Sequence, residues 1–327
     1  MNSAIDSLPV LVINPYSRCN CRCVMCDIWR GTDVHALTRD NLERQLESVA
    51  DLNVRWIAFS GGDPLMHPNL FELCQAVKRR GICLTLVTTG LLLERFAHEI
   101  FANADDVIVS LDGPGPVHDN IRKVTGAFRS LHDGIAAVHA LNAHFAIAAR
   151  CTVQSRNCGS LVKTVKVARE IGIDSLSFLA VDVHSTAFNR TDPLTVLQQS
   201  DLAVGITQIP TLDAEIEAIV DSGDCNAFVV ESPAKLRRIS HHFRCYWNLA
   251  RYVAPRCNAP WKSAVLESDG TVRPCFFHAA IGVLKPGTDL RAILESEAAV
   301  RFRSDLNVNS NSVCQRCVCS LNWRDKE

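Results

Sequence analysis

The sequence lacks an excess of charge of either sign. Its 34 lysines and arginines balance 35 aspartates and glutamates, which leaves a formal net charge of −1. Proteins that bind nucleic acids or anionic membrane surfaces usually carry a basic excess. We therefore expect neither nucleic acid nor a membrane among the partners of this protein.

Long apolar runs are missing as well. No stretch approaches the roughly 20 consecutive apolar residues of a membrane-spanning helix. The N-terminal sequence MNSAIDSLPVLVINPYS has no basic start, and its apolar run is short for a signal peptide. We find no internal repeat and no low-complexity segment. These absences predict a soluble, cytoplasmic protein.

Cysteine, in contrast, is abundant, with 15 residues. Disulfides are disfavoured in a reducing compartment, so clustered cysteines there more often indicate metal or redox chemistry. Four cysteines lie singly among apolar residues and are expected in the core: Cys74, Cys83, Cys151 and Cys158. Two groups lie in loop-like segments instead: Cys19, Cys21, Cys23 and Cys26, and then Cys257, Cys275, Cys314, Cys317 and Cys319.

Short β-type runs alternate with amphipathic helical stretches over the first 180 residues. The runs cover residues 10–14, 56–60, 83–88, 106–111, 145–153 and 175–180. Between the first two, Leu42, Leu46 and Val49 share one helical face. Such alternation indicates βαβ units with a parallel sheet, and six units are too few for a closed eight-stranded barrel. We predict an α/β fold, a partial (β/α)6 TIM-like barrel, with function at the C-terminal ends of its strands.

The alternation lapses after about residue 190, which divides the chain into three predicted parts. Residues 8–190 form the partial barrel, and residues 191–250 form a linker and bridging helical region with a helix near 212–220. Residues 251–327 form a small C-terminal domain with a β-hairpin plus a helix. The hairpin turn is expected at Ser268-Asp269-Gly270.

The first cysteine group follows the first predicted strand directly. Cys19, Cys23 and Cys26 have the spacing C-x3-C-x2-C. Three thiolates can hold three irons of a [4Fe–4S] cluster and leave the fourth iron open. A structural zinc site normally has four protein ligands, and only Cys21 is available as the fourth. Because its spacing suits an iron–sulfur cluster poorly, we expect Cys21 to point away.

This motif resembles the signature of radical S-adenosylmethionine (radical SAM) enzymes, and further motifs of that superfamily occur in order. SGGDP (residues 60–64) follows the second predicted strand, TTG (88–90) ends the third and SLDGP (110–114) ends the fourth. Two positions depart from the usual pattern. Met25 stands where an aromatic residue is common before the third cysteine, and Asp63 stands where glutamate is common.

The resemblance implies that a [4Fe–4S] cluster on Cys19, Cys23 and Cys26 and SAM together generate a 5′-deoxyadenosyl radical, which abstracts hydrogen from the substrate. It implies that Asp63 binds the amino group of SAM and that Asp112 binds the ribose, although Asp112 before Gly113 also suits a simple turn. The implied SAM-binding positions are Met25, Ser60, Gly61, Gly62, Asp63, Pro64, Thr89, Ser110, Asp112, Arg122 and Asn157.

The second cysteine group resembles the twitch form of the SPASM/twitch extension of these enzymes. Cys257 and Cys275 flank the predicted hairpin, and Cys314 and Cys317 form a later C-x2-C. Taken alone, four thiolates at this spacing suit a zinc ribbon about equally well. After a radical SAM core, an auxiliary [4Fe–4S] cluster is favoured. A fully ligated cluster of this kind serves electron transfer or braces the fold, and Cys319 is left as a spare.

These features predict an enzyme with two [4Fe–4S] clusters and SAM, acting on a small-molecule or peptide substrate and reduced by a donor such as flavodoxin or ferredoxin. The favoured reaction is a two-electron oxidation in a specialised biosynthetic pathway, because the cluster architecture resembles that of 2-deoxy-scyllo-inosamine dehydrogenases. A redox-neutral reaction (decarboxylation or epimerisation) and peptide modification are alternatives, and a non-catalytic iron–sulfur or zinc redox sensor is the alternative of another class.

Asp182 and His184, after the sixth strand, are candidate catalytic residues, whereas His241 and His242 are expected to form a solvated pair.

Overall fold

The computed structural model describes residues 5–190 and 192–324. The predicted boundary at residue 191 and the two chain ends, 1–4 and 325–327, lie outside the described residues. Six parallel strands alternate with helices, as predicted. The strands are β1 (Val10–Tyr16), β2 (Trp56–Gly61), β3 (Cys83–Thr88), β4 (Asp106–Ser110), β5 (Ala146–Val153) and β6 (Ser175–Ala180).

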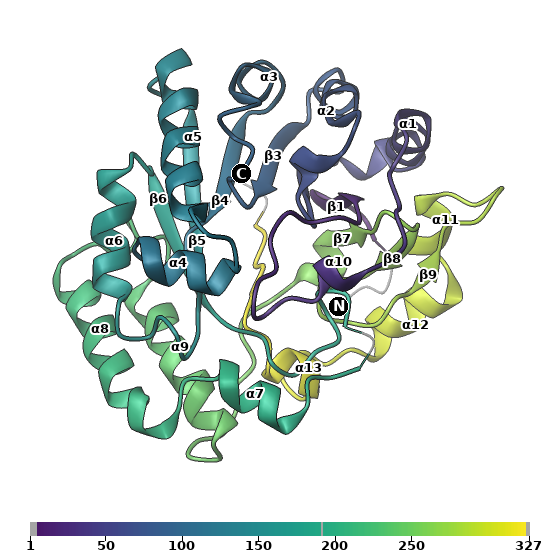
Figure 1. The fold of residues 1–327 in the computed structure, drawn as a ribbon. Helices are drawn as coiled ribbons and strands as arrows, with labels where there is room; N and C mark the ends of the chain where they lie inside the picture. The colour runs from purple at the N-terminus through teal and green to yellow at the C-terminus, as the bar shows by residue number, and fades with distance from the viewer. Residues whose placement is uncertain (1–4, 191, 325–327) are drawn as a thin grey trace.

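The helices of this part cover the outer side of the curved sheet (Figure 1). They are α1 (Arg39–Ser48), α2 (Leu70–Lys78), α3 (Ala97–Asn103), α4 (Gly115–Arg122), α5 (Ala127–Leu141) and α6 (Leu161–Glu170). The apolar spacing of Leu42, Leu46 and Val49 predicts a helix that includes Val49, but the observed helix ends one residue before it. Helix α1 stops before Val49 and a 3-10 turn, η2 (Ala50–Leu52), follows it. Short 3-10 turns also occur at η1 (Ile28–Arg30), η3 (Pro64–Met66) and η4 (Ile206–Gln208).

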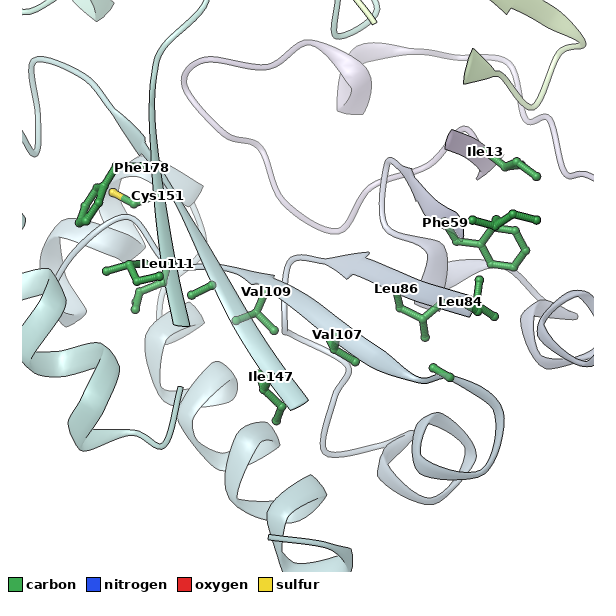
Figure 2. Packing of buried hydrophobic residues seen from close by; sticks show 14 of the residues in the cluster. Ile13, Phe59, Leu84, Leu86, Val107, Val109, Leu111, Ile147, Cys151 and Phe178 are labelled. Carbon is green, nitrogen blue, oxygen red and sulfur yellow. The ribbon is translucent and has the colours of Figure 1, made fainter. Parts of the chain in front are cut away.

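The core lies between the sheet and these helices. Alternate strand residues such as Ile13, Phe59, Leu84 and Val107 are fully buried there, and Figure 2 shows them in neighbouring positions along the sheet. Buried and half-buried residues alternate along β1 and β6, which leaves one side of the sheet for the helices. The other side, and the C-terminal strand ends, remain available for a site.

Residues 192–250 are helical, as predicted, but the expected linker holds a helix of its own. Helix α7 (Val196–Leu202) begins with a capping box in which Thr195 and Gln198 satisfy each other's backbone N–H groups. It is followed by α8 (Ile209–Asp221) and α9 (Pro233–Tyr246), which pack against α6 and β6. None of the described helices is long and apolar enough to cross a membrane.

The predicted C-terminal hairpin forms, and it continues the barrel sheet. Strands β7 (Ser263–Leu266) and β8 (Thr271–Arg273) join at a turn in which Gly270 has φ +88°. Strand β7 pairs in parallel with β1, so the sheet order is β6-β5-β4-β3-β2-β1-β7-β8-β9, with β9 at Gly282–Val283. The remaining helices are α10 (Ala259–Lys262), α11 (Leu290–Leu294), α12 (Glu297–Asp305) and α13 (Ser312–Gln315).

Candidate cofactor sites and active site

The loop that follows β1 carries the first cysteine group and is closed on itself by hydrogen bonds. Arg18 donates from its two terminal guanidinium nitrogens to the carbonyl oxygens of Gly31 and Thr32, both at 2.9 Å. At the base of the loop, the backbone N–H of Ser17 donates to the carbonyl oxygen of His35. The loop therefore holds a fixed path at the C-terminal end of the sheet.

The three predicted iron ligands lie together in this loop. Burial raises the pKa of the Cys19 and Cys26 thiols to about 12. A side-chain hydrogen bond with Cys21 and the nearby Arg122 guanidinium lower the pKa of Cys23. Crowded, buried thiols are costly to ionise without a cation, and bound metal would supply that charge. The donor set therefore fits an iron–sulfur cluster.

Cys21 does not point into solvent. It is 1% exposed and lies beside Cys23, and the hydrogen bond with Cys23, together with burial, raises its pKa. Its backbone N–H also lies 3.5 Å from the Cys19 sulfur. Cys21 thus contacts predicted ligands through its thiol and its backbone, whereas its exclusion from the ligand set stays a prediction.

The glycine motif after β2 packs against the cysteine loop. A Cβ atom on Gly62 would lie 2.0 Å from the carbonyl oxygen of Arg18, and Gly61 has φ +99°. The backbone N–H of Asp63 donates to that same Arg18 carbonyl at 2.9 Å. Glycine is therefore required here for the approach of two backbone segments, in addition to any approach of a ligand.

Asp63 is fully buried at the centre of this region. Its carboxylate accepts hydrogen bonds from the Thr88 hydroxyl, from the Thr89 hydroxyl and N–H, and from the N–H of Leu65. Burial raises its pKa, and these hydrogen bonds oppose the rise. Asp63 thus connects the ends of β2 and β3, and Pro64 after it begins η3. Binding of SAM by Asp63 stays a prediction.

A second carboxylate, Asp112, lies after β4 and forms a buried ion pair. Nη2 of Arg122 is 2.7 Å from Oδ2 of Asp112, and Nη1 donates to the Cys23 sulfur at 3.5 Å. Oδ1 of Asp112 accepts from the N–H of Thr152. Asn157 completes this group by donating to the carbonyl oxygen of Asp112 at 2.9 Å. Asp112 is therefore more than a turn residue, because it orients a cation onto a predicted iron ligand.

The remaining predicted SAM-binding residues lie around the same strand ends. Ser60 and Ser110 are half-buried in the last residues of β2 and β4. The sulfur of Met25 accepts from Nε2 of Gln154 at 3.8 Å, and the Thr89 hydroxyl oxygen lies 2.9 Å from Oδ1 of Asn20 in the cysteine loop. The structure therefore brings the positions from the motifs to one edge of the sheet.

The two catalytic candidates after β6 have different environments. Asp182 is buried and paired with Arg190, with Nη1 2.8 Å from Oδ2. Nη2 of Arg190 donates to the carbonyl oxygen of Met25 at 2.8 Å. This pair therefore connects the end of β6 to the cysteine loop. A carboxylate that holds a buried cation is poorly suited to exchange protons, so the geometry favours a structural role for Asp182.

His184 is half-buried, and its Nε2 lies 3.1 Å from the Tyr252 hydroxyl. Burial lowers its pKa, and the positive charge of Arg316 lowers it further, while Asp182 opposes the shift. The imidazole is therefore neutral near pH 7 and able to accept a proton. Arg316 itself stands between the predicted ligands Cys314 and Cys317.

Sequence reasoning was wrong about His242, which is 7% exposed rather than solvated. Its ring centre is 6.3 Å from that of His184 and 5.7 Å from that of Tyr252, and its Nε2 has no hydrogen-bond partner among the described residues. Burial lowers its pKa to about 3. The helical spacing from Leu236 through Ile239 places His242 on the buried face of α9. That spacing was a signal that could have revealed it.

The second cysteine group converges on one cavity. Burial raises the pKa of Cys275 to about 12 and that of Cys314 to about 11. All four predicted ligands line the cavity together with mainly apolar neighbours: Pro255, Cys257, Pro260, Cys275, Phe277, His278, Val308, Val313, Cys314 and Cys317. Four thiols around one apolar cavity fit an iron–sulfur cluster. Cys319 is exposed, and its carbonyl oxygen accepts a hydrogen bond from the Cys317 thiol.

Within residues 5–190 and 192–324, no three histidine, cysteine or acidic side chains are arranged to hold a single metal ion.

Comparison with known proteins finds one family match in the N-terminal part of the chain and a second in the C-terminal part. The family model of the radical SAM superfamily matches residues 13–149, and that of the SPASM iron–sulfur cluster-binding domain matches residues 257–318. The chain is 33% identical over 159 residues to an AdoMet-dependent heme synthase of Methanosarcina barkeri, covering 47% of this chain and 45% of that protein. It is 33% identical over 124 residues to a probable GTP 3′,8-cyclase of Methanococcus maripaludis, covering 36% of this chain and 41% of that protein. The chain thus spans less than half the length of these curated relatives.

A solved structure supports the fold over nearly the whole chain. Streptococcus suis SuiB bound to S-adenosylmethionine superposes with a TM-score of 0.69 at 16% identity, covering 98% of this chain and 74% of that one. A radical SAM domain binds a [4Fe–4S] cluster and SAM, and a SPASM domain binds further iron–sulfur clusters. The motifs at the strand ends, the partial barrel and the four-thiol cavity agree with these matches. The chain therefore combines a radical SAM domain with a C-terminal SPASM-type iron–sulfur domain.

Proposed function

We propose that this radical SAM enzyme oxidises an alcohol carbon of its substrate by two electrons, as a dehydrogenase of a specialised biosynthetic pathway. The observation that carries the proposal is the second site, where four thiols line one apolar cavity. Four protein ligands leave no iron free to bind substrate. A cluster held in this way suits electron transfer, which a dehydrogenation requires.

The chemistry of the proposal divides between the cofactors and the chain. When bound, the first cluster and SAM supply the 5′-deoxyadenosyl radical that takes the hydrogen atom, and the second cluster supplies an acceptor for one electron. An H–C–OH group that has lost this hydrogen atom still has one proton and one electron to lose before it becomes C=O. The chain must therefore provide a base near the barrel mouth.

His184 is our proposed base. Its lowered pKa keeps the imidazole neutral near pH 7, and its contact with the Tyr252 hydroxyl gives an accepted proton a second polar group to move to. Tyr252 connects His184 to the second site, because the Arg316 guanidinium lies 5.8 Å from the centre of the Tyr252 ring and Arg316 stands between Cys314 and Cys317. We propose that Asp63, Asp112, Arg122 and Asn157 position SAM, directly or through the hydrogen bonds described above.

The substrate is proposed to be a small molecule or a peptide, and the electron donor a flavodoxin- or ferredoxin-like protein. The named relatives are a heme synthase and a GTP cyclase, whereas the SuiB structures include one bound to precursor peptide SuiA. These names favour neither class strongly. Cytoplasmic location stays an expectation from the sequence.

The test is the double variant Cys314→Ala/Cys317→Ala, reduced anaerobically with SAM and a candidate alcohol substrate. We expect 5′-deoxyadenosine to form at a rate similar to that of the wild type while oxidised product is lost. The measurement is parallel quantification of both compounds, with Cys319→Ala as the matched control that keeps both. Normal product from a folded double variant that lacks the second cluster would contradict dehydrogenation and favour redox-neutral chemistry.

A further inference from the structure

His278 occupies a fixed position at the second cysteine site. It follows Cys275 by three residues and is 6% exposed. Its ring packs edge-on against Phe302 of α12, with ring centres 4.9 Å apart. Its carbonyl oxygen accepts a hydrogen bond from Nη1 of Arg273 in β8 at 3.2 Å. Helix α12 thus fixes the ring of His278, and strand β8 fixes its backbone.

The ring points a nitrogen at one predicted ligand. Nε2 of His278 lies 3.3 Å from the Cys314 sulfur, and the histidine lines the same cavity as the four thiols. A cysteine that binds iron is a thiolate, which has no proton to donate. The hydrogen bond must then run from an N–H on Nε2 to the sulfur, which fixes the tautomer of the imidazole.

A hydrogen bond to a thiolate ligand changes the electronic properties of an iron–sulfur cluster. Reduction adds negative charge to the cluster and its sulfur atoms. A donor therefore stabilises the reduced form more than the oxidised form, and this raises the reduction potential. The effect is large in an apolar cavity, where water does not compete as a donor, and the other non-cysteine residues lining this cavity are apolar.

We propose that His278 donates a hydrogen bond to Cys314 and thereby raises the reduction potential of the auxiliary cluster. This proposal adds a residue role to the function proposed above. It rests on that function in one respect, because it assumes that the auxiliary cluster accepts an electron from the substrate. His278 is a positioning residue that acts through Cys314. At the other ligands, Nη2 of Arg238 donates to the backbone oxygen of Cys317. The backbone N–H groups of Phe277 and His278 donate to the Cys275 sulfur, so the His278 ring is a side-chain donor beside backbone ones.

The first test is a redox titration followed by electron paramagnetic resonance. The full chain carries alanine at Cys19, Cys23 and Cys26, so that only the auxiliary cluster contributes. We expect His278→Leu to shift the midpoint potential to a more negative value and His278→Gln, which keeps an N–H donor, to restore part of the shift. His139→Leu, at a half-buried histidine of α5 that contacts the Phe145 carbonyl, is the matched control and should leave the potential unchanged. A wild-type potential in His278→Leu with full auxiliary iron would overturn the proposal.

The second test needs no substitution at His278, so it holds even where His278→Leu fails to bind its cluster. Pulsed paramagnetic resonance is measured on the same chain grown with ¹⁵N-labelled histidine and reduced with dithionite. A weak nitrogen coupling to the auxiliary cluster supports the hydrogen bond. Absence of coupling, or a coupling as strong as that of a directly bound nitrogen, would overturn it.

Failure of this proposal can be told apart from failure of the proposed function, because neither test uses a substrate. If the potential shifts as expected but the wild-type enzyme forms no oxidised product, dehydrogenation is wrong and the role of His278 stands. If oxidised product forms and the potential does not shift, His278 has no such role and the function stands.

Discussion

The two cysteine sites are built in opposite ways. The first takes its cysteines from eight consecutive residues in one loop, Cys19 to Cys26, whereas the second gathers them from segments up to 60 residues apart, Cys257 to Cys317. The first is held by charged groups, since Asp112–Arg122 and Asp182–Arg190 are buried ion pairs that both contact the loop. The second is lined by apolar side chains and His278.

This difference matches two different tasks. Charged and polar groups around the first site can bind a polar, charged molecule such as SAM at the open iron. An apolar cavity closed by four thiols excludes such a molecule and suits a cluster that exchanges only electrons. Under the function proposed above, the environment of each site, more than its cysteine spacing, separates the proposed site for chemistry from the proposed site for electron transfer.

The largest effect that would test this comparison is removal of the first ligand set. We expect the loaded wild type to carry about eight irons, as two [4Fe–4S] clusters. Cys19→Ala/Cys23→Ala/Cys26→Ala should lose about half the iron and all cleavage of SAM, as measured by iron content and 5′-deoxyadenosine. Cys21→Ala is the matched control and should keep nearly all the iron. Loss of iron in that control equal to the loss in Cys23→Ala would show that the ligand set is wrong.

The next effect concerns the charged groups that hold the first loop. Arg190→Met leaves the buried Asp182 carboxylate without its cation, which should lower the free energy of unfolding by about 3–5 kcal/mol. Urea unfolding under anaerobic conditions measures this loss. The matched control is Arg237→Met at an exposed pair with Glu217, 53% and 47% exposed, where the loss should stay below about 1 kcal/mol. Equal losses in the two variants would contradict the bracing role of Arg190.

A smaller effect is expected at Asp63. A charge-assisted hydrogen bond to the ammonium group of SAM contributes about 1.5–3 kcal/mol, so Asp63→Asn should weaken SAM binding by about tenfold or more. Binding can be measured by equilibrium dialysis on protein whose cluster absorbance is unchanged. Thr88→Val removes one hydrogen bond to the same carboxylate but keeps its charge, and should have a smaller effect. Unchanged affinity in Asp63→Asn would remove Asp63 from the SAM site.

The smallest effect is a pH dependence that arises from the buried His242. The folded state keeps this imidazole neutral down to a pKa of about 3, while an unfolded histidine binds a proton below about pH 6.5. The unfolded state therefore binds more protons as the pH falls. His242 should lower the free energy of unfolding by about 1.4 kcal/mol for each pH unit below 6.5.

Urea unfolding at pH 7.5, 6.5 and 5.5 measures this slope. His242→Leu should have a shallower slope than the wild type, although other buried histidines such as His118 still contribute. His241→Gln, the adjacent and more exposed residue, should keep the wild-type slope. Parallel slopes for His242→Leu and the wild type would show that the burial of His242 has no energetic consequence.

The sequence predicted the barrel because strand and helix periodicities are local. All six parallel strands and the hairpin turn at Gly270 occur where expected, and the motif residues lie at strand ends. The contacts of Arg122 and Arg190 with the cysteine loop could not be predicted, since they join residues that are far apart in the sequence. Arg190 reaches the carbonyl oxygen of Met25, 165 residues earlier, and no local pattern encodes that contact.

The burial of individual cysteines and histidines was predicted less well than the strands. His242 was expected to be solvated and is buried, whereas Cys83 was expected in the core and is exposed. The burial of Cys21 beside the predicted ligands was not predicted. Adjacent histidines look solvated when only their polarity is considered, whereas the spacing of α9 places one of them on its buried face. Comparing the position of His242 with the apolar face of the predicted helix would have improved the prediction for this residue. Cys21 offers no comparable signal.

The parallel pairing of β1 with β7 has a consequence for how the chain folds. Strand β1 is the first strand of the barrel, yet one of its edges pairs with residues 263–266, about 250 residues later in the chain. Contacts between such distant segments form slowly, because a long loop must close before they contribute. During synthesis, the barrel therefore exposes an open strand edge beside the cysteine loop until the C-terminal segment arrives, and open edges are prone to aggregate. Completion of the sheet and assembly of the second cysteine site thus depend on the same late event.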